Sequence, residues 1–341
     1  MEKLIGKDIN ELTSIAEQIG QKPFVAKQIA HWLYTKRIHS IDEMSNLSKQ
    51  CRSKLSERYN IGLKAPIKVT VSNDGTKKYL FDVGIDTPEY IESVYIPDSD
   101  RATLCVSTQA GCRMGCKFCF TGGLGFHRNL TSSEILNQIF SIPESNTLTN
   151  IVYMGMGEPM DNIDNVLKSL SALTSSWGCG WSGSRITVST VGLIPGMKRF
   201  LSESDCHLAI SLHNPFDDER LSIMPIQRAY PISKVLDSLD DNLFKHQRRL
   251  SFEYICFAGA NDTMRHAREL VRRLGKRHCR INLIKYHNDG TGEFIGSSQQ
   301  QMEWLCNYLN DNGIRTTIRR SRGEDIMAAC GMLVAKETKE S

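Results

Sequence analysis

The feature that most constrains the fold is a regular alternation of strand-like and helix-like segments that begins near residue 101. Short runs rich in β-branched and aromatic residues are separated by amphipathic stretches of helical length. Strands joined by helical crossovers form a parallel sheet with right-handed connections. Because eight such units close a full barrel, six predict an α/β fold with an open or partial barrel. The expected strands are ATLCVS, NIVYMG, RITVST, HLAISL, SFEYICF and RINLI, with helices expected at residues 131–142, 162–174, 194–203, 231–244 and 263–275.

The segments on either side of this pattern have a different character. Apolar residues at helical spacing, among them Phe24, Ile29 and Trp32, predict a small helical domain at residues 1–65. The β-rich runs IKVTV, KKYLFDV and EYIESVYI predict an antiparallel connector at residues 66–97. We expect the core at residues 98–325, including a helix at 297–311 and a strand near 314–319, and a C-terminal segment at 326–341.

Composition and charge narrow the class of protein. Residues 1–65 hold 11 basic and 7 acidic side chains, so the net charge of +4 lies in that part and the remainder is balanced. A basic module suggests a polyanionic partner, although most charge excesses of this size are solvated surface. We find no signal-like start and no apolar run long enough to cross a bilayer, and therefore expect a cytoplasmic protein with no membrane partner.

The eleven cysteines fall into two groups. An odd count without a secretion signal argues against a disulfide framework. Five cysteines sit in distinctive local sequences, and six have apolar neighbours that predict core positions. These six are Cys51, Cys179, Cys206, Cys256, Cys279 and Cys306.

Cys112, Cys116 and Cys119 form the most specific motif, C-x3-C-x2-C, directly after the first expected strand of the barrel. Three thiolates at this spacing can surround a [4Fe–4S] cluster and leave one iron open. The alternative is a zinc site, which normally needs a fourth protein ligand. His127 is the nearby candidate for that ligand.

Polar residues follow the next expected strands at the points where they end. Gly155-Met156-Gly157-Glu158-Pro159 follows the second strand, and a glycine pair allows close approach of a ligand to the backbone. Alone, this motif indicates no more than a strand-to-helix turn. However, carboxyl ends of parallel strands meet at one mouth, so these groups are expected to converge. The other groups are Ser189-Thr190-Val191-Gly192, Ser211-Leu212-His213, and His287 with Asn288.

These motifs resemble those of the radical S-adenosylmethionine (SAM) superfamily. The ordered set TLCVSTQAGCRMGCKFC, GMGEP, STVG, SLH and RGEDIMAACG is similar to the RlmN family of radical SAM RNA methyltransferases over about residues 90–333. The resemblance implies a partial (β/α)6 radical SAM barrel with a helical accessory domain and a β-rich connector. It also implies a [4Fe–4S] cluster on the three cysteines and SAM, used twice per turnover. The implied SAM contacts are Gly157, Glu158, Ser189, Ser211, Leu212, His213 and His287.

The same resemblance implies three catalytic side chains. Cys330, in Ala-Ala-Cys-Gly, would carry the methyl group as S-methylcysteine, and Cys105 would resolve the resulting adduct through a transient disulfide. Glu92 matches the family's proton acceptor. His287 departs from the pattern, because the family carries Asn as a SAM contact there, and Asn288 could shift into that role.

The implied reaction is methylation of adenine carbon 2 in a loop of 23S rRNA and beside the tRNA anticodon, with an external one-electron reductant. Two alternatives stay open: methylation of adenine carbon 8, or a non-catalytic iron–sulfur protein that binds nucleic acid. Pro159 looks more like the carbon-2 branch. For phosphate binding, the basic candidates are Arg319, Arg320 and Arg322 and a set at residues 265–280, which could equally be a solvated helix face.

Overall fold

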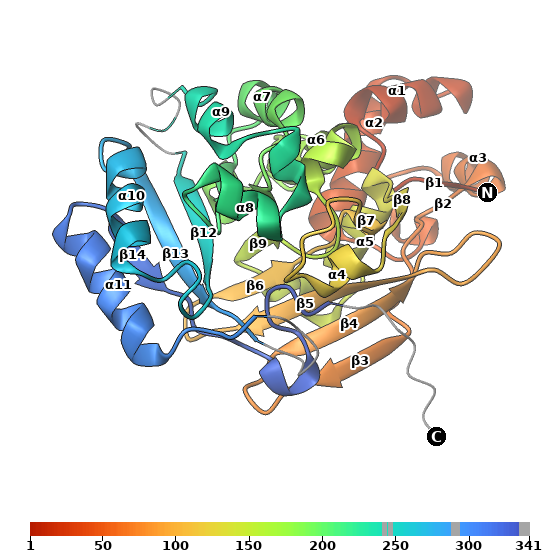
Figure 1. The fold of residues 1–341 in the computed structure, drawn as a ribbon. Helices are drawn as coiled ribbons and strands as arrows, with labels where there is room; N and C mark the ends of the chain where they lie inside the picture. The colour runs from red at the N-terminus through yellow and green to blue at the C-terminus, as the bar shows by residue number, and fades with distance from the viewer. Residues whose placement is uncertain (241–243, 245–247, 288–293, 334–341) are drawn as a thin grey trace.

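A single ten-stranded sheet forms the spine of the computed structural model, which describes residues 1–240, 244, 248–287 and 294–333 (Figure 1). Seven strands run parallel, in the order β14-β13-β12-β11-β10-β9-β6, and an antiparallel meander of β5, β4 and β3 continues the sheet. The two outer strands, β14 and β3, do not pair within the described residues, so the barrel is open. The parallel strands are β6 (Ala102–Cys105), β9 (Asn150–Tyr153), β10 (Ile186–Thr190), β11 (His207–Ser211), β12 (Leu250–Cys256), β13 (Cys279–Lys285) and β14 (Arg315–Ile318).

The six strands expected from the sequence are all present, and β14 adds a seventh parallel strand. Helices cover the outer face of the sheet (Figure 1). The expected helix at residues 231–244 is shorter, because α9 ends at Asp237, and residues 241–243 lie outside the described part. The helices of this layer are α5 (Ser132–Phe140), α6 (Ile163–Thr174), α7 (Ile194–Glu203), α8 (Asp217–Ile223), α9 (Ile232–Asp237), α10 (Met264–Leu274) and α11 (Gln299–Asp311).

Local sequence explains where the first of these helices begins. Thr131 caps α5 by accepting a hydrogen bond from the Glu134 N–H, and the Glu134 carboxylate accepts one from the Thr131 N–H at 2.9 Å. This reciprocal capping box satisfies two backbone donors that a helix start leaves unpaired. Ile135 and Ile139, one turn apart, are fully buried against the sheet.

The connector is part of the same sheet rather than a separate layer. Its strands are β3 (Lys68–Val71), β4 (Lys77–Asp82) and β5 (Tyr90–Pro97), and all pair antiparallel. The last of them, β5, pairs with β6 so that Val94 lies opposite Cys105. The expected meander is therefore confirmed, and its register places β5 beside the first strand of the barrel.

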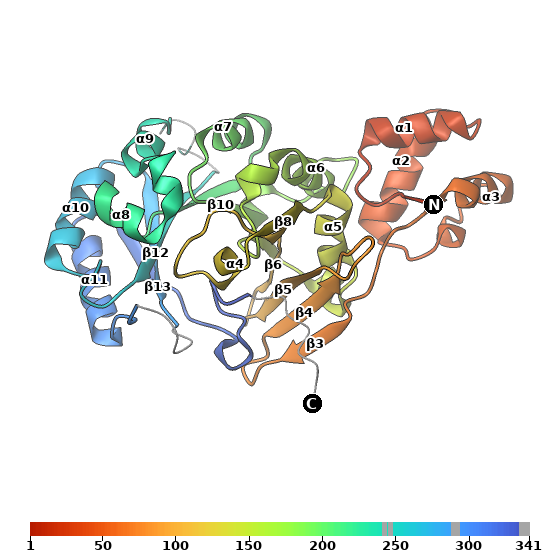
Figure 2. The same ribbon diagram turned by 45° about the vertical axis from the view of Figure 1, so that its right-hand side comes forward.

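The N-terminal part is helical, as expected, and packs on the barrel beside α5 and α6 (Figure 2). Val25, Ile29 and Leu33 are buried, but Phe24 is exposed because it lies on the outer face of its helix. Tyr34 packs its ring against Phe140 and Trp177 of the barrel. The elements are β1 (Glu2–Lys3), α1 (Ile9–Gln18), α2 (Phe24–Ala30), a π-helix η1 (His31–Lys36), α3 (Lys49–Arg58) and β2 (Tyr59–Asn60).

Strand alternation decides which side chains face the interior of the open barrel. On β12, Glu253 points inward and accepts a hydrogen bond from Asn282 of β13 at 2.7 Å. Arg280 and Ile284 of β13 share that inward face, because each is two residues from Asn282. The interior therefore holds polar groups at several levels along the strands. Within the described residues, no helix is long and apolar enough to cross a membrane.

Candidate active site

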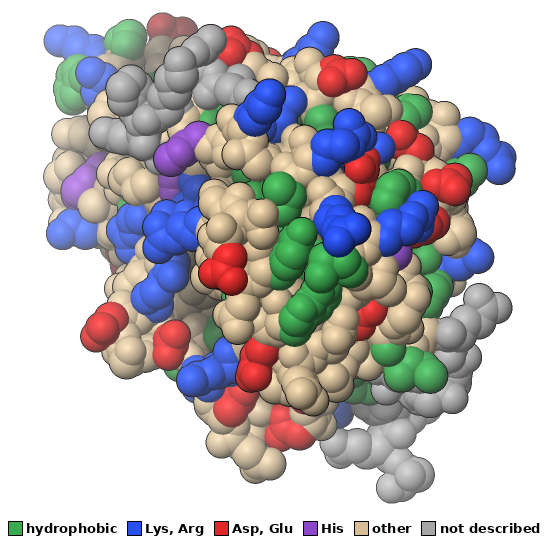
Figure 3. Space-filling view, turned by 60° about the vertical axis from the view of Figure 1, so that its left-hand side comes forward, with side chains coloured by type: hydrophobic (Ala, Val, Ile, Leu, Met, Phe, Trp, Pro, Cys, Tyr) green, Lys and Arg blue, Asp and Glu red, His purple; other side chains and the backbone are tan. Residues whose placement is uncertain are grey.

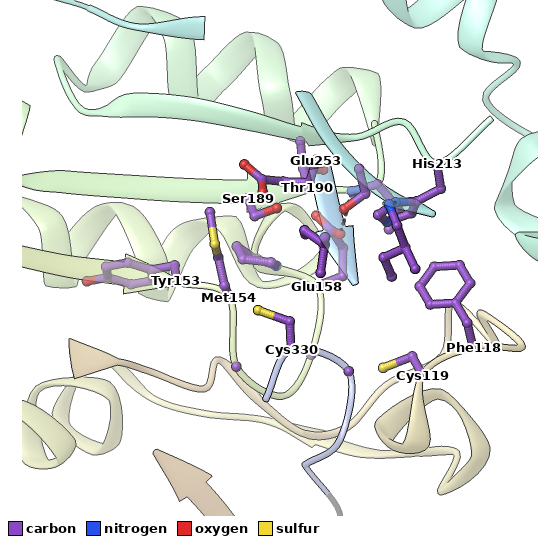
Figure 4. Close-up of a pocket in the computed structure, with 18 of the residues that line it drawn as sticks. Phe118, Cys119, Tyr153, Met154, Glu158, Ser189, Thr190, His213, Glu253 and Cys330 are labelled. Atoms are coloured by element: carbon purple, nitrogen blue, oxygen red, sulfur yellow. Dashed lines mark hydrogen bonds between the residues drawn. The ribbon is translucent and has the colours of Figure 1, made fainter. Parts of the chain in front are cut away.

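A cavity of about 660 Å³, part of it open to solvent, lies at the carboxyl ends of the parallel strands. Turns after β9, β10 and β11 supply one wall, and the C-terminal segment closes it from the other side. Figure 4 shows Cys330 between Met154 and Cys119, with Glu158 above it. The wall includes Phe118, Cys119, Met154, Gly155, Gly157, Glu158, Ser189, Thr190, Ser211, His213, Glu253, Arg319 and Cys330.

The Gly155–Glu158 turn is held tightly against the loop that follows β6. The Met156 N–H donates to Ser107 Oγ at 2.8 Å, and the Glu158 N–H donates to Gln109 Oε1 at 2.8 Å. Gly157 has a φ of +96°, and a Cβ there would lie 2.5 Å from Gln109 Cβ. Only glycine fits this position, because a side chain would be strained and would clash.

Glu158 is almost completely buried, and burial raises the pKa of its carboxyl group to about 7 despite the hydrogen bonds that it accepts. Its two oxygens accept bonds from the N–H groups of Met160 at 3.0 Å and Val191 at 2.9 Å. The Thr190 side chain bonds to the same carboxylate. Because a carboxylate offers about four acceptor positions, one remains. The carboxyl group therefore joins two strand-end turns and can still accept a bond from a ligand's ammonium group.

The cysteine motif forms a loop beside this wall. The Cys119 N–H donates to the Cys116 carbonyl at 3.1 Å, and the Phe120 N–H donates to the Gly331 carbonyl at 2.8 Å. The pKa of the Cys116 thiol is well above its ordinary value because of burial and because of the neighbouring Cys119 and Cys112. The three thiols are therefore neighbours in one partly exposed loop, of which Cys116 is the buried member, and Cys119 reaches the cavity wall.

The donor set fits a cluster better than a single metal ion. Among the described residues, no three Cys, His, Asp or Glu side chains lie close enough together to hold one metal ion. A cubic cluster distributes its thiolates over different irons, so its ligands stand further apart than those of zinc. His127, the fourth ligand that a zinc site would need, pairs instead with Glu89 at 2.9 Å on the surface.

The remaining strand ends offer free polar groups. Neither the Ser189 nor the Ser211 hydroxyl has a hydrogen-bond partner within the part of the chain that the structure describes, and both line the cavity. His213 is buried against Phe118, with 4.8 Å between ring centroids, and its Nδ1 accepts a bond from the Ile255 N–H. Burial, and then Arg220, lower the pKa of His213 to about 3, so the ring is neutral.

Two wall residues were missed by the sequence reasoning as site residues. Glu253 sits inside an apolar strand, and Arg319 follows β14; their charged groups pair at 3.4 Å across the cavity. The sequence predicts Arg319 as one of the phosphate-binding arginines. Its guanidinium instead points into the barrel, beside Cys105 and Cys330, with only a third of the side chain exposed.

Comparisons with known proteins agree with this geometry. Residues 3–61 match the family described as the ribosomal RNA large subunit methyltransferase N-terminal domain, and residues 106–274 match the radical SAM superfamily. A crystal structure of a radical SAM methyltransferase from Sphaerobacter thermophilus superposes with a TM-score of 0.91 and 36% identity, covering 98% of this chain and 100% of that chain.

Curated relatives extend over nearly the whole chain. A probable dual-specificity RNA methyltransferase RlmN from Bacteroides fragilis is 52% identical over 338 residues, which is 99% of this chain and 98% of the relative. The dual-specificity RNA methyltransferase RlmN of Geobacter sulfurreducens is 40% identical over 331 residues, covering 97% of this chain and 91% of that protein. The chain belongs to the RlmN family.

A second cavity adjoins the first in this RlmN-family chain. Cys330, Arg319 and Ile284 line both cavities, so they form the wall between them. Cys330 is exposed, and Cys105 is buried behind it on β6. The pKa of Cys105 is raised to about 12 by burial and by Cys330, whereas Arg319 opposes the rise. All eleven cysteines are free thiols in this structure.

Glu92 lines neither the first cavity nor the second. It is buried on β5, and its carboxylate pairs with Lys78 Nζ at 3.0 Å. Lys78 also donates to the Met327 carbonyl at 3.4 Å, three residues before Cys330. Because Val94 is the register partner of Cys105, Glu92 is its diagonal neighbour on the same face. The structure therefore brings Glu92 and Cys105 together on the side of the C-terminal segment.

Two expected SAM contacts are placed differently from the others. His287 lines the second cavity, where its Nε2 lies 2.8 Å from Ser321 Oγ and its Nδ1 lies 3.5 Å from a Glu324 carboxylate oxygen. Leu212 is buried in the core, and its backbone bonds to Glu253 and Arg220. The structure thus brings neither side chain to the first cavity, and Asn288 lies outside the described residues.

Proposed function

We propose that this RlmN-family enzyme methylates carbon 2 of an adenine in RNA through a methyl thioether on Cys330. The observation that carries the proposal is the position of Cys330 in the wall shared by two cavities. A side chain placed there can receive a methyl group from one cavity and deliver it into the other. Adenine carbon 2 is electron-poor, so direct transfer of a methyl cation to it is unfavourable.

The first cavity is the proposed SAM site. Glu158 and the backbone of Gly157 would receive the amino-acid part of SAM, and the free hydroxyls of Ser189 and Ser211 would bind its polar groups. Cys112, Cys116 and Cys119 would hold the cluster beside that cavity. When bound, the cluster and SAM supply the radical that removes a hydrogen atom from the methyl group on Cys330.

The second cavity is the proposed entrance for RNA. Its wall includes Lys285, Arg320 and Arg322, whose charges suit phosphate groups. The target adenine must enter unstacked, because its carbon-2 edge is hidden in a helix. His287 belongs to this wall, and we therefore propose that it contacts the RNA side of the site rather than SAM.

Three side chains of this chain would perform the covalent and proton steps. The Cys330 sulfur attacks the SAM methyl carbon, forming a thioether and releasing S-adenosylhomocysteine. After the methylene has bonded to adenine, the adduct must lose one electron and one proton to become aromatic again. Glu92 would accept the carbon-2 proton, and the electron would return to the oxidised cluster when it is present. Attack of the Cys105 thiolate on the Cys330 sulfur forms a disulfide and breaks the carbon–sulfur bond to the RNA. The methylene carbon leaves with the electron pair of that bond and takes up a proton, which completes the methyl group. Because the disulfide must be reduced again, turnover would need external reductant.

The RNA substrates are proposed from the relatives. Curated relatives are described as dual-specificity RNA methyltransferases, and the N-terminal part matches a ribosomal RNA methyltransferase domain. We propose 23S rRNA and tRNA as the two substrates, which also agrees with the expected cytoplasmic location.

The Cys105→Ala variant tests the mechanism directly. Without a resolving thiol, we expect a covalent protein–RNA species attached at Cys330, visible on denaturing gels and located by mass spectrometry. Cys306→Ala, which changes a cysteine of α11 outside both cavities, is the matched control and should release product normally. Release of methylated RNA by Cys105→Ala at the wild-type rate would contradict the proposal.

The position of the methyl group on adenine distinguishes methylation at carbon 2 from methylation at carbon 8. Nucleoside mass spectrometry of RNA treated with the wild-type enzyme should show 2-methyladenosine. Detection of 8-methyladenosine would assign the chain to the carbon-8 reaction, and absence of SAM cleavage in the reduced, cluster-loaded protein would leave only a binding role.

A further inference from the structure

A group of basic side chains lies at the end of the barrel opposite both cavities. We call it the lower basic site and define it by Arg249, Arg280 and Arg315, with His207, Arg248 and His278 beside them. These residues line a hollow at the amino ends of β11 to β14. In Figure 3, Lys, Arg and His side chains gather around a hollow at the upper left of the view. Nothing in the proposed reaction uses this end of the barrel.

Sheet register explains why these side chains converge. Arg280 of β13 and Arg315 of β14 are direct register partners, so their side chains leave the sheet on the same face. Arg249 immediately precedes β12, and its N–H donates to His207 Nδ1 at 2.9 Å. Strand alternation places Glu253 and Ile284 on the inner face of the barrel. The same alternation places the guanidinium groups of Arg249, Arg280 and Arg315 on that face, at the amino ends of the strands.

The charges of this site are not balanced by the protein. Across the described ranges, no carboxylate lies within ion-pair distance of Arg249, Arg280 or Arg315. Burial, and then the neighbouring Arg280, lower the pKa of the Arg249 guanidinium, as burial and Arg315 do for Arg280. Both pKa shifts agree with guanidinium groups that lie close enough to repel one another. This repulsion is unfavourable when no anion is bound.

Several other arginines of the surface are instead paired with carboxylates. Arg272 pairs with Glu269 at 2.6 Å, and Arg199 pairs with Asp164 at 2.6 Å. Arg265 also pairs with a carboxylate, that of Glu219. Arg265 and Arg272 of α10 are thus neutralised by carboxylates. Arg268 and Arg280 of the same set have no ion pair among the described residues.

His207 lines the site but adds no positive charge to it. Burial, and then Arg249, lower its pKa to about 4, so the ring is neutral near pH 7. Arg248 is largely buried and faces one carboxylate, that of Asp205, at 3.7 Å. Its Nε donor has no hydrogen-bond partner among the described residues. Because Arg248 Nη1 donates to the Leu201 carbonyl of α7 at 2.8 Å, its side chain points away from the hollow, and we assign the positive charge of the site to Arg249, Arg280 and Arg315.

We propose that the lower basic site binds phosphate groups, which the substrate RNA supplies from outside its target loop. Arg280 and Lys285 lie five positions apart on β13, which corresponds to roughly 17 Å along the strand. A single target nucleotide in the second cavity cannot reach that far. A longer RNA, however, can extend along the open side of the barrel and place several phosphates at its lower mouth.

The site favours a polymer over a small metabolite. It is open to solvent, and arginine side chains dominate its wall, with His207, His278 and Ser184 as further polar groups. Arginine binds phosphate in a bidentate manner without reading sequence. These properties suit backbone contacts that raise affinity for RNA in general. The assignment of RNA as the source of these phosphates rests on the proposed function.

A charge-matched pair of triple variants tests the proposal in the cluster-loaded, full-length protein. Arg249→Gln/Arg280→Gln/Arg315→Gln removes the lower site, and Arg199→Gln/Arg265→Gln/Arg272→Gln removes the same charge from paired surface positions. Binding of labelled full-length tRNA is measured by fluorescence anisotropy over a series of salt concentrations. We expect the lower-site variant to bind at least about tenfold more weakly, with a salt slope reduced by about 2 to 3.

The control triple should retain the wild-type affinity and slope, and both variants should cleave SAM at the wild-type rate. A short single-stranded oligonucleotide that carries only the target adenine and its neighbours should bind equally to all three proteins. Equal losses in both triple variants would show that only net charge matters and would overturn the proposal.

Inorganic pyrophosphate serves as the small-anion probe in calorimetry. If the wild-type protein binds it, the lower-site variant does not, and tRNA affinity is nevertheless unchanged, the ligand is a free phosphate compound and the RNA assignment is wrong. Loss of tRNA binding in the lower-site variant with intact SAM cleavage supports the proposal independently of where the enzyme places its methyl group.

Discussion

Among single residues, Arg319 has the strongest influence on the proposed chemistry because it is the charged group beside both reactive thiols. Burial alone would lower its pKa, but Glu253, Cys330 and Cys105 raise it, so the guanidinium stays charged. Its positive charge opposes the rise in the pKa of Cys105 that burial and Cys330 cause. Because the thiolate is the nucleophile, Arg319 should set how readily Cys105 attacks.

Replacing Arg319 with methionine should raise the pKa of Cys105 above its value of about 12. At neutral pH each unit of pKa lowers the thiolate fraction about tenfold, so release of RNA from Cys330 should slow by about that factor. The pH profile of product release in single turnover should move to higher pH, and Arg319→Lys should restore part of the rate. An unchanged profile in Arg319→Met would contradict this role.

Gly157 makes a second residue-scale prediction. Gly157→Ala places a Cβ at a φ of +96°, within 2.5 Å of Gln109 Cβ. We expect a loss of about 1–3 kcal/mol in the free energy of unfolding and weaker SAM binding. Gly123→Ala is the control, because a Cβ there meets nothing within 4 Å. Chemical denaturation measures the free energy of unfolding of both variants. Similar values for the two would argue against a strained turn.

At the scale of elements, the segment that carries Cys330 is held from two sides. The Gly323 N–H donates to Asp74 Oδ2 at 3.0 Å in the turn between β3 and β4. At the other end, Thr121 Oγ1 of the cysteine loop donates to the Leu333 carbonyl at 2.8 Å. The connector and the cysteine loop therefore position Cys330 jointly, although neither contains it.

Asp74→Ala should loosen this segment without unfolding the barrel. Hydrogen exchange at residues 323–333 should accelerate and methyl transfer should slow, while Asp86→Ala, an exposed loop change, should alter neither. Burial would raise the pKa of Asp74, but bonds from Thr76 and Gly323 lower it from 3.8 to about 2. Its contribution is therefore complete above pH 3.8 and is lost as the pH falls through 2. Unchanged exchange in Asp74→Ala would contradict the role assigned to the connector turn.

How much the sequence predicts also differs by element. The six strands and the convergence of their ends follow from hydrophobic period and from the parallel topology, so the turns at Gly157, Ser189 and Ser211 could be placed in advance. The side chains that pair across neighbouring strands could not be placed in advance. Glu253 was missed because an inward acid in the middle of a strand is identified only when its neighbours are known, although a charged residue inside LSFEYIC was a usable signal.

Arg319 shows the same limit at the end of β14. Arg315, Thr317 and Arg319 alternate with outward-facing residues, so period two would have placed Arg319 on the inner face. Sequence proximity groups it instead with Arg320 and Arg322, which line the second cavity but not the first. The reassignment of His287 to the second cavity has a similar cause, because the path of the chain after β13 is not encoded in a local motif.

At the scale of the whole molecule, the N-terminal helices and the barrel share one hydrophobic core. Tyr34 contributes to it from η1, between Phe140 and Trp177, and its hydroxyl bonds to the backbone of Gly6 and Lys7. Arg37 reaches from the same helix to the backbone and side chain of Ser145. The molecule should therefore unfold as a unit rather than as two independent domains.

Tyr34→Ala should lower the free energy of unfolding by about 3–5 kcal/mol, because it removes a fully buried aromatic ring. Calorimetry should show one transition at a lower temperature, with fluorescence and circular dichroism changing together. Tyr308→Ala on α11, which removes a partly buried ring that stacks on Trp304, should have a smaller effect. Two separate transitions in Tyr34→Ala would show that the parts are independent.

The central claim is that Cys330 carries the methyl group between the two cavities, and mass spectrometry of the Cys330 peptide tests it most directly. The cluster-loaded protein would be incubated anaerobically with SAM bearing a deuterated methyl group, in the absence of RNA, and then digested. The account predicts a single deuterated methyl group on Cys330 and none on Cys105. An unmodified Cys330 in protein that cleaves SAM and methylates RNA would contradict it.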